Sequence, residues 1–164
     1  MAEMKTMKDL LADEIKDLYS AEKQLTKAIP KMAQGATEPE LREALVAHLA
    51  ETEAQVERLE QSASLLGIKP GGKKCKGMEG VIEEGSEALA QKGDSGVVDL
   101  GIIGAGSRVE HYEIAGYKSA IALANAIEAE DVAELLQQSL DEEMAAEETL
   151  RGVAEGLMSA RAAA

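Results

Sequence analysis

Apolar residues recur at steps of three and four along most of the chain, which is the spacing of one face of an α-helix. In the first segment this stripe is formed by Leu11, Ile15, Leu18, Leu25, Ile29 and Met32. Similar stripes continue almost to the end of the sequence. Together they predict four long helices and one short helix, over residues 5–34, 39–66, 77–91, 96–126 and 131–159.

Helix-breaking residues separate these stripes and set the topology. Gly35 offers a stop for the first helix, whose last turn we expect Pro30 to weaken, and Thr37 with Glu40 is a candidate cap for the second. Pro70-Gly71-Gly72 opens a long connection that carries the short helix. Two helical hairpins joined by one long crossover are typical of a ferritin-like antiparallel four-helix bundle. We therefore expect residues 1–164 to form a single all-α domain of this class.

An internal repeat supports two similar hairpins. A shift of 91 positions partly aligns the first half of the chain with the second. The matched pairs are Glu22 with Glu113, Leu49 with Leu140, Glu51 with Glu142, and Leu59 with Leu150. One offset that fits both helix pairs predicts a bundle with approximate two-fold symmetry.

Composition narrows the choice of partners. The 164 residues include no Phe or Trp and carry a formal net charge of −14, which disfavours nucleic acids and anionic membranes. A single cysteine excludes an intrachain disulfide, and we see no secretory signal and no apolar run long enough to span a membrane. We expect a cytoplasmic protein.

Polar residues interrupt every long stripe near its middle, on the face that should be apolar. They are Glu22 in the first helix, His48, Glu51, Thr52 and Gln55 in the second, Glu110 and Glu113 in the third, and Glu142, Glu143 and Glu147 in or beside the stripe of the last. A buried carboxylate has to be paired, protonated or bound to a metal ion. Interruptions at matching depth on four helices predict a common site.

The chemistry that needs such a set is a dinuclear metal centre, because two neighbouring divalent ions need several carboxylates and an imidazole. We predict a site for two iron or manganese ions whose ligands come from Glu22, His48, Glu51, Glu110, Glu113, Glu142 and Glu143. The alternative is structural: Arg58 and Arg108 could pair with these acids, His48 could be a hydrogen-bonded core histidine, and the acids of the last helix could face solvent.

Four segments resemble the YciF/YciE-like family of stress-induced bacterial proteins. They are residues 17–25, 48–52, 55–60 and 110–114, which read DLYSAEKQL, HLAET, QVERLE and EHYEI. The resemblance extends over nearly the whole chain. It implies a ferritin-like fold related to rubrerythrins and a homodimer, and it leaves the biochemical activity undefined.

The sequence departs from the usual di-iron pattern, in which two helices each supply Glu-x-x-His. Here His48 and Glu51 stand in the reverse order, the last helix has no histidine, and His111 lies off the stripe. Two functions therefore stay open. One is a di-iron or di-manganese oxidoreductase that handles O2, peroxide or iron under stress. The other is a non-catalytic, dimeric stress or interaction protein whose metal site is vestigial or empty.

Cys75 lies among several lysines, which could lower its pKa and make it reactive. We expect an ordinary exposed thiol instead. Tyr19 and Tyr112 lie close to the acids in the sequence, and we expect both to hydrogen-bond a carboxylate.

Overall fold

The computed structural model describes residues 4–162 and is all-helical over that range, as the sequence predicts. Five helices follow in order: α1 (Met7–Gly35), α2 (Pro39–Leu66), α3 (Lys76–Ala90), α4 (Ser95–Ala126) and α5 (Glu130–Ala162). The last helix ends three residues beyond its expected limit, and Arg161 in its final turn pairs with Asp94 at the start of α4.

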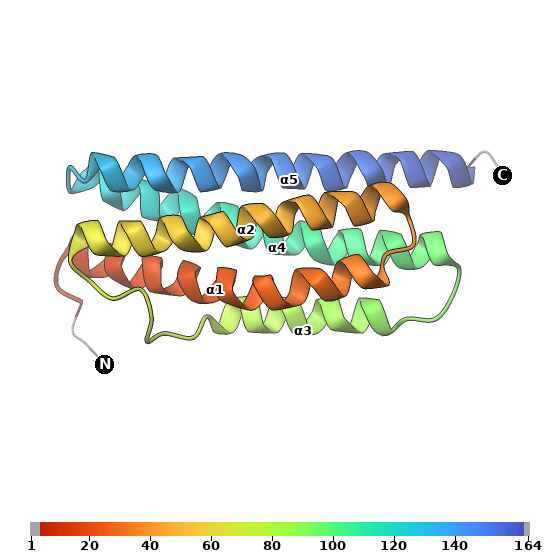
Figure 1. The fold of residues 1–164 in the computed structure, drawn as a ribbon, viewed down its shortest axis with the longest axis horizontal. Coiled ribbons are helices and arrows are strands. Elements are labelled where there is room, and N and C mark those ends of the chain that lie inside the picture. The colour runs from red at the N-terminus through yellow and green to blue at the C-terminus, as the bar shows by residue number, and fades with distance from the viewer. Residues whose placement is uncertain (1–3, 163–164) are drawn as a thin grey trace.

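The four long helices pack as two antiparallel hairpins side by side (Figure 1). α1 packs against α2 and α4, and α5 packs against α4 and α2, which closes a four-membered ring. The crossover from α2 to α4 carries α3, which lies outside this ring against α1 and α4 (Figure 1). This is the predicted ferritin-like bundle with its long connection.

The apolar core falls into two clusters, one in each half of the bundle. One contains Leu25, Ile29, Met32, Ile102 and Val109, and the other contains Leu11, Leu18, Leu59, Tyr117 and Leu136. Burying one such aliphatic side chain stabilises a fold by about 1.5–3 kcal/mol. The polar residues of interest lie between the two clusters, so apolar packing on both sides holds them in place.

The start of α2 differs from the expectation. Glu38, not Thr37, is the N-cap of α2 and makes no side-chain cap bond. Instead, buried Asp99 of α4 accepts hydrogen bonds from the Thr37 amide at 2.9 Å, the Thr37 hydroxyl at 2.6 Å and the Glu38 amide at 2.9 Å. The start of α2 is therefore capped by a neighbouring helix.

Pro30 does not end α1, which continues to Gly35. Ile29, Met32 and Ala33 around it are all buried. This packing outweighs the backbone hydrogen bond that proline removes. At the end of α2 the prediction fits better: Gly67 has a φ of 71°, a left-handed conformation that glycine adopts without strain.

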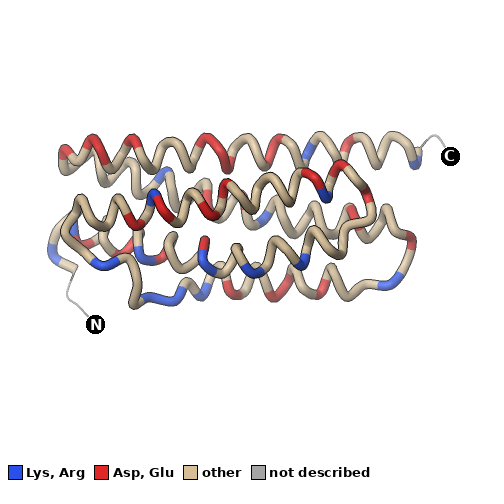
Figure 2. The backbone as a smooth tube through the Cα atoms, in the orientation of Figure 1, with Lys and Arg blue, Asp and Glu red and all other residues tan. Residues whose placement is uncertain are grey.

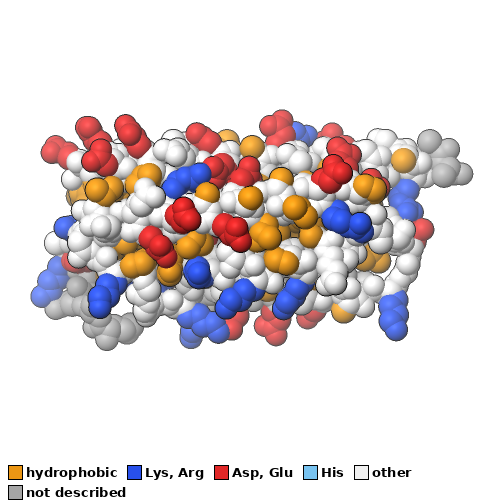
Figure 3. All heavy atoms as spheres, viewed as in Figure 1, with side chains coloured by type: hydrophobic (Ala, Val, Ile, Leu, Met, Phe, Trp, Pro, Cys, Tyr) orange, Lys and Arg blue, Asp and Glu red, His pale blue; other side chains and the backbone are white. Residues whose placement is uncertain are grey.

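Charge is unevenly distributed over the surface. Basic residues follow α1 and the loop before α3, whereas acidic residues follow α5 (Figure 2). In the space-filling view, acidic side chains dominate one long edge of the molecule, whereas the opposite edge carries both basic and acidic side chains (Figure 3). Within residues 4–162, no helix is both long enough and apolar enough to cross a bilayer.

Candidate metal centre

Five ionisable side chains from all four long helices meet in the middle of the bundle. They are Glu22 of α1, His48 of α2, Glu110 and Glu113 of α4, and Glu143 of α5. Glu22, Glu113 and Glu143 are fully buried, and His48 and Glu110 nearly so. Each occupies a core-facing position of its helix, so the helical repeat itself aims it inward.

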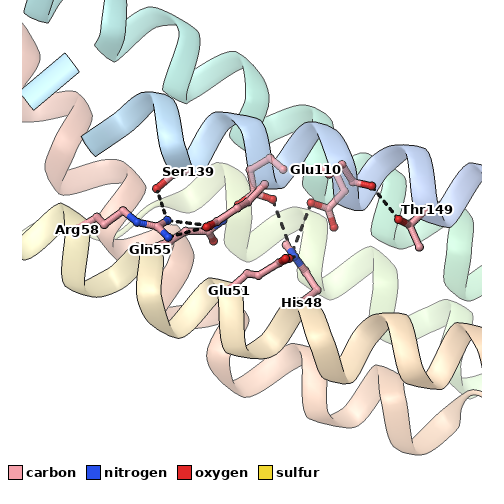
Figure 4. Close-up of polar contacts among 10 residues, drawn as sticks. His48, Glu51, Gln55, Arg58, Glu110, Ser139 and Thr149 are labelled. Carbon is pink, nitrogen blue, oxygen red and sulfur yellow. Dashed lines mark hydrogen bonds and ion pairs between the residues drawn. The ribbon is translucent and has the colours of Figure 1, made fainter. Parts of the chain in front are cut away.

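The distances bring four of the five within reach of one cation. Nε2 of His48 lies 3.5 Å from Oε2 of Glu110 and 3.6 Å from Oε2 of Glu143. One ligand atom from each of His48, Glu110, Glu113 and Glu143 lies within 4.8 Å of the others. Figure 4 shows His48 reaching from α2 towards Glu110. We call these four residues with Glu22 the buried cluster.

Several polar atoms of the buried cluster have no hydrogen-bond partner. They are both carboxylate oxygens of Glu113 and of Glu143, Oε2 of Glu22, Oε2 of Glu110 and Nε2 of His48. Leaving a buried polar atom unpaired costs about 1–3 kcal/mol, and more for a charged one. The residues have the chemistry and the free atoms to hold a cation.

Burial also changes the protonation of the acids. Loss of solvent raises the pKa of Glu22 to about 8 and that of Glu110 to about 7, and the charges of neighbouring glutamates act in the same direction. The pKa values of Glu113 and Glu143 are raised well above the ordinary glutamate range for the same reasons. Without a cation, the buried cluster therefore retains protons at neutral pH.

Tyr117 completes the interior on the α1 side, and we did not predict it. Its hydroxyl donates to Oε1 of Glu22 at 2.5 Å, and the ring is fully buried. Tyr117 lies one helical turn beyond Glu113 on the same stripe, and that spacing was the signal that could have identified it.

Glu51 and Glu142 lie outside the buried cluster. Glu51 is 43% exposed, and one of its oxygens is 3.2 Å from Nδ1 of His48. This contact orients the ring so that Nε2 faces the acids. Glu142 turns away: it forms a bidentate pair with Arg58 at 2.5 and 2.7 Å and accepts from Gln55 at 3.0 Å.

Among the predicted ligands, Glu142 alone pairs with an arginine, as the structural alternative expected. The other candidate cation, Arg108, donates to the backbone oxygen of Gly104. Glu143, adjacent to Glu142, is the acid of α5 that faces the interior.

The α2 side of the interior carries neutral groups. Thr52 and Gln55 are fully buried, and Oγ1 of Thr52 and Oε1 of Gln55 have no partner. The 91-residue shift aligns Thr52 with Glu143 in the sequence. The repeat is broken at this position, because α5 supplies a carboxylate where α2 supplies a hydroxyl. The charged ligands are therefore concentrated towards α4 and α5.

Cys75 is buried, which corrects the expectation of an exposed thiol. It is the N-cap of α3, where its sulfur accepts from the Met78 amide, and it lies 3.0 Å from the Tyr112 hydroxyl. Burial raises the pKa of the thiol, so the neighbouring lysines do not activate it. The two tyrosines behave as expected: Tyr19 donates to Glu60 and Tyr112 to Asp17.

The ring of four antiparallel helices, the long crossover and the buried carboxylates define a ferritin-like bundle protein. The chain belongs to a family described as a domain of unknown function, DUF892, whose model matches residues 6–163. It is 42% identical to protein YciF of Escherichia coli K12 over 154 residues, which is 92% of each chain. The resemblance seen in the sequence is confirmed.

Solved structures agree. The crystal structure of the E. coli stress protein YciF has a TM-score of 0.92 and 38% identity, covering 95% of this chain and 99% of that one. A protein of Rhodopseudomonas palustris, described as a putative structural protein, has a TM-score of 0.88 and 42% identity over 91% and 95% of the two chains. A Xanthomonas campestris protein has a TM-score of 0.76 and 26% identity over 94% and 95%.

Proposed function

We propose that this protein is a stress-response metalloprotein whose buried cluster binds two iron or manganese ions for the handling of O2, peroxide or iron. The observation that carries the proposal is the set of buried, unpartnered donor atoms contributed by all four long helices. By contrast, Glu142, next to Glu143 on α5, is paired with Arg58. The stress role rests on the similarity to E. coli YciF.

The donor set fits such ions, since carboxylates with one imidazole suit iron and manganese. His48, Glu110, Glu113 and Glu143 would hold one ion, and Glu22 would contribute to holding the second. Iron or manganese would supply an exchangeable electron and a binding position for oxygen species. The chain would orient His48 through Glu51, fix one oxygen of Glu22 through Tyr117, and keep bulk water away with the two apolar clusters.

Adjacent glutamates on α5 provide a matched test. The purified chain is reconstituted without oxygen with ferrous or manganous ion and desalted, and its metal content is measured. We expect the unmodified chain to retain about two ions. Glu143→Gln should lose at least half of them, whereas Glu142→Gln should match the unmodified chain. Metal at background in the unmodified chain would refute the proposal.

A second function is favoured by different observations. The site has a single histidine, Glu142 is already paired with Arg58, and one relative is described as a putative structural protein. A non-catalytic stress protein with an empty site would gain stability from Glu22→Gln and Glu113→Gln, most at alkaline pH, where these glutamates would otherwise carry buried charge. A metalloprotein would instead lose the stabilisation that added metal gives.

We propose further that the chain acts in the cytoplasm as a homodimer. Large apolar side chains stand exposed on several helices, among them Val46 at 58%, Leu65 at 56% and Met144 at 49%. The dimer is what the resemblance to the YciF-like family implies, and these side chains would be available to pack against a second copy. Light scattering is expected to give twice the mass of one chain.

A further inference from the structure

A narrow pocket between α2 and α5 reaches the buried cluster from the surface. It encloses about 120 Å³ and has His48, Glu51 and Glu110 among its lining residues. Glu51 is partly exposed, whereas His48 and Glu110 are buried, so the pocket runs from Glu51 inward. In Figure 4, His48 and Glu51 extend from α2 towards Glu110 and Thr149 on the opposite side.

Small residues on the facing helices create this space. Its apolar lining consists of four alanines and two leucines: Ala44, Leu45 and Ala47 of α2, and Ala145, Ala146 and Leu150 of α5. Leucine or methionine at the alanine positions would fill the space between two packed helices. The Thr149 hydroxyl also lines the pocket, but it donates to the backbone oxygen of Ala145 at 2.9 Å. The walls are therefore mainly apolar, and the ionisable groups lie along the path to the buried cluster.

A second apolar groove gives a useful contrast. It lies between α1, α3 and α4, encloses about 230 Å³, and is lined by residues that include Leu25, Ala28 and Val109. No residue of the buried cluster lines it. The groove between α1, α3 and α4 is therefore larger than the α2–α5 pocket, but it does not reach the ligand atoms of the buried cluster.

Size and polarity limit what the α2–α5 pocket can admit. The pocket has room for a few water-sized molecules. Sites for drug-sized ligands enclose about 300–1,000 Å³. An ion would lose hydration against the apolar walls, whereas a neutral molecule would lose little.

We propose that the α2–α5 pocket is the route by which a small uncharged oxidant, dioxygen or hydrogen peroxide, reaches a metal ion held by His48, Glu110 and Glu143. This inference rests on the proposed function and adds to it a route and a substrate class. It assigns Ala44 and Ala146 as residues that keep the route open. Larger organic substrates are excluded by the same walls.

Nitric oxide is a suitable probe, because it is a neutral diatomic molecule that binds ferrous iron with a visible absorption change. Each chain is loaded with ferrous iron under anaerobic conditions, its iron content and melting temperature are measured, and its rate of combination with nitric oxide is followed by stopped flow. We expect Ala44→Leu and Ala146→Leu to slow this rate by about tenfold or more with unchanged iron content. Ala28→Leu, the same substitution in the other groove, should leave the rate unchanged.

The outcomes separate this inference from the proposed function. Equal rates in all iron-loaded chains, or an equal loss of rate in Ala28→Leu, would overturn the pocket as the route. Absence of both iron and manganese from the unmodified chain after reconstitution would instead overturn the proposed function, and the metal measurement shows this before any nitric oxide is added. If a leucine variant does not fold, Ala146→Val offers a smaller change, for which an intermediate rate supports the route and an unchanged rate counts against it.

Discussion

Tyr117 and Glu22 form a hydrogen bond that lies wholly inside the protein. The phenol holds one oxygen of Glu22 at 2.5 Å while the other oxygen has no partner. This bond favours the charged carboxylate and lowers the pKa of Glu22, against the larger effect of burial, which raises it. Tyr117 thus keeps a potential ligand oriented without neutralising it.

Removing the Tyr117 hydroxyl is expected to destabilise the metal-free protein. Tyr117→Phe leaves Oε1 of Glu22 unpaired in the interior, so the free energy of unfolding should fall by about 1–3 kcal/mol in urea titrations. Tyr19→Phe is the matched control, because Tyr19 donates to Glu60 in an exposed bond. Its effect should stay within about 0.5 kcal/mol. Similar losses in both variants would contradict a special role for Tyr117.

At the scale of single elements, α2 depends on α4 for its start. Asp99 is buried and accepts three hydrogen bonds from Thr37 and Glu38, so it fixes the short connection between α1 and α2. The first helical hairpin is therefore tied to the second at this end of the bundle. His48 lies further along α2, so the position at which α2 starts also fixes where His48 lies in the bundle.

Asp99→Ala should be costly for that reason. Two backbone amides and one hydroxyl lose their acceptor, and we expect the free energy of unfolding to fall by about 2–4 kcal/mol. The comparison is Asp94→Ala, which removes an exposed cap of α4 that also pairs with Arg161. That change should cost about 1 kcal/mol. Urea unfolding measures both, and a smaller loss for Asp99→Ala would show that α2 starts without its help.

The helices themselves could be predicted from the sequence, because their apolar stripes are long and their breaks contain glycine or proline. The cap of α2 could not, because Asp99 is distant in the chain and nothing local to Thr37 indicates it. The sequence also could not show which of Glu142 and Glu143 faces the interior, because both lie near the core stripe. In the structure, Glu143 faces the interior, and Arg58 on the neighbouring helix pairs with Glu142.

The burial of Cys75, in the crossover, could not be predicted from the sequence either. Its lysine-rich surroundings indicated an exposed loop, yet the path of the crossover places the thiol at the N-terminus of α3 and against Tyr112 of α4. Burial there depends on how the connection crosses the bundle, which helical periodicity does not encode. That the cluster residues bind metal stays a prediction.

At the scale of the whole molecule, the buried cluster links stability to pH. Glu22 has a pKa of about 8 and Glu110 of about 7 in the folded protein, above the ordinary glutamate value of about 4.3 in the unfolded chain. Between these values the folded state holds protons that the unfolded state has released. The contribution of these two groups to the free energy of unfolding is therefore largest below about pH 4.5. It falls as the pH rises through their folded pKa values.

We expect the free energy of unfolding of the metal-free protein to fall by about 3 kcal/mol or more between pH 5 and pH 9 in urea titrations with a chelator present. Glu22→Gln with Glu110→Gln should flatten this dependence. Glu53→Gln with Glu57→Gln removes the same number of charges from exposed positions on α2 and should leave the slope in place. Equal slopes in both double variants would mean that general surface repulsion, not the buried cluster, sets the pH response.

The burial of Cys75 has a practical consequence. This thiol is the single cysteine of the chain, and it sits where the crossover meets α1 and α4. A thiol-specific reagent can reach it only when that junction opens. The unmodified protein thus carries its own reporter of local opening, and the labelling rate measures how often the crossover detaches without any engineered probe.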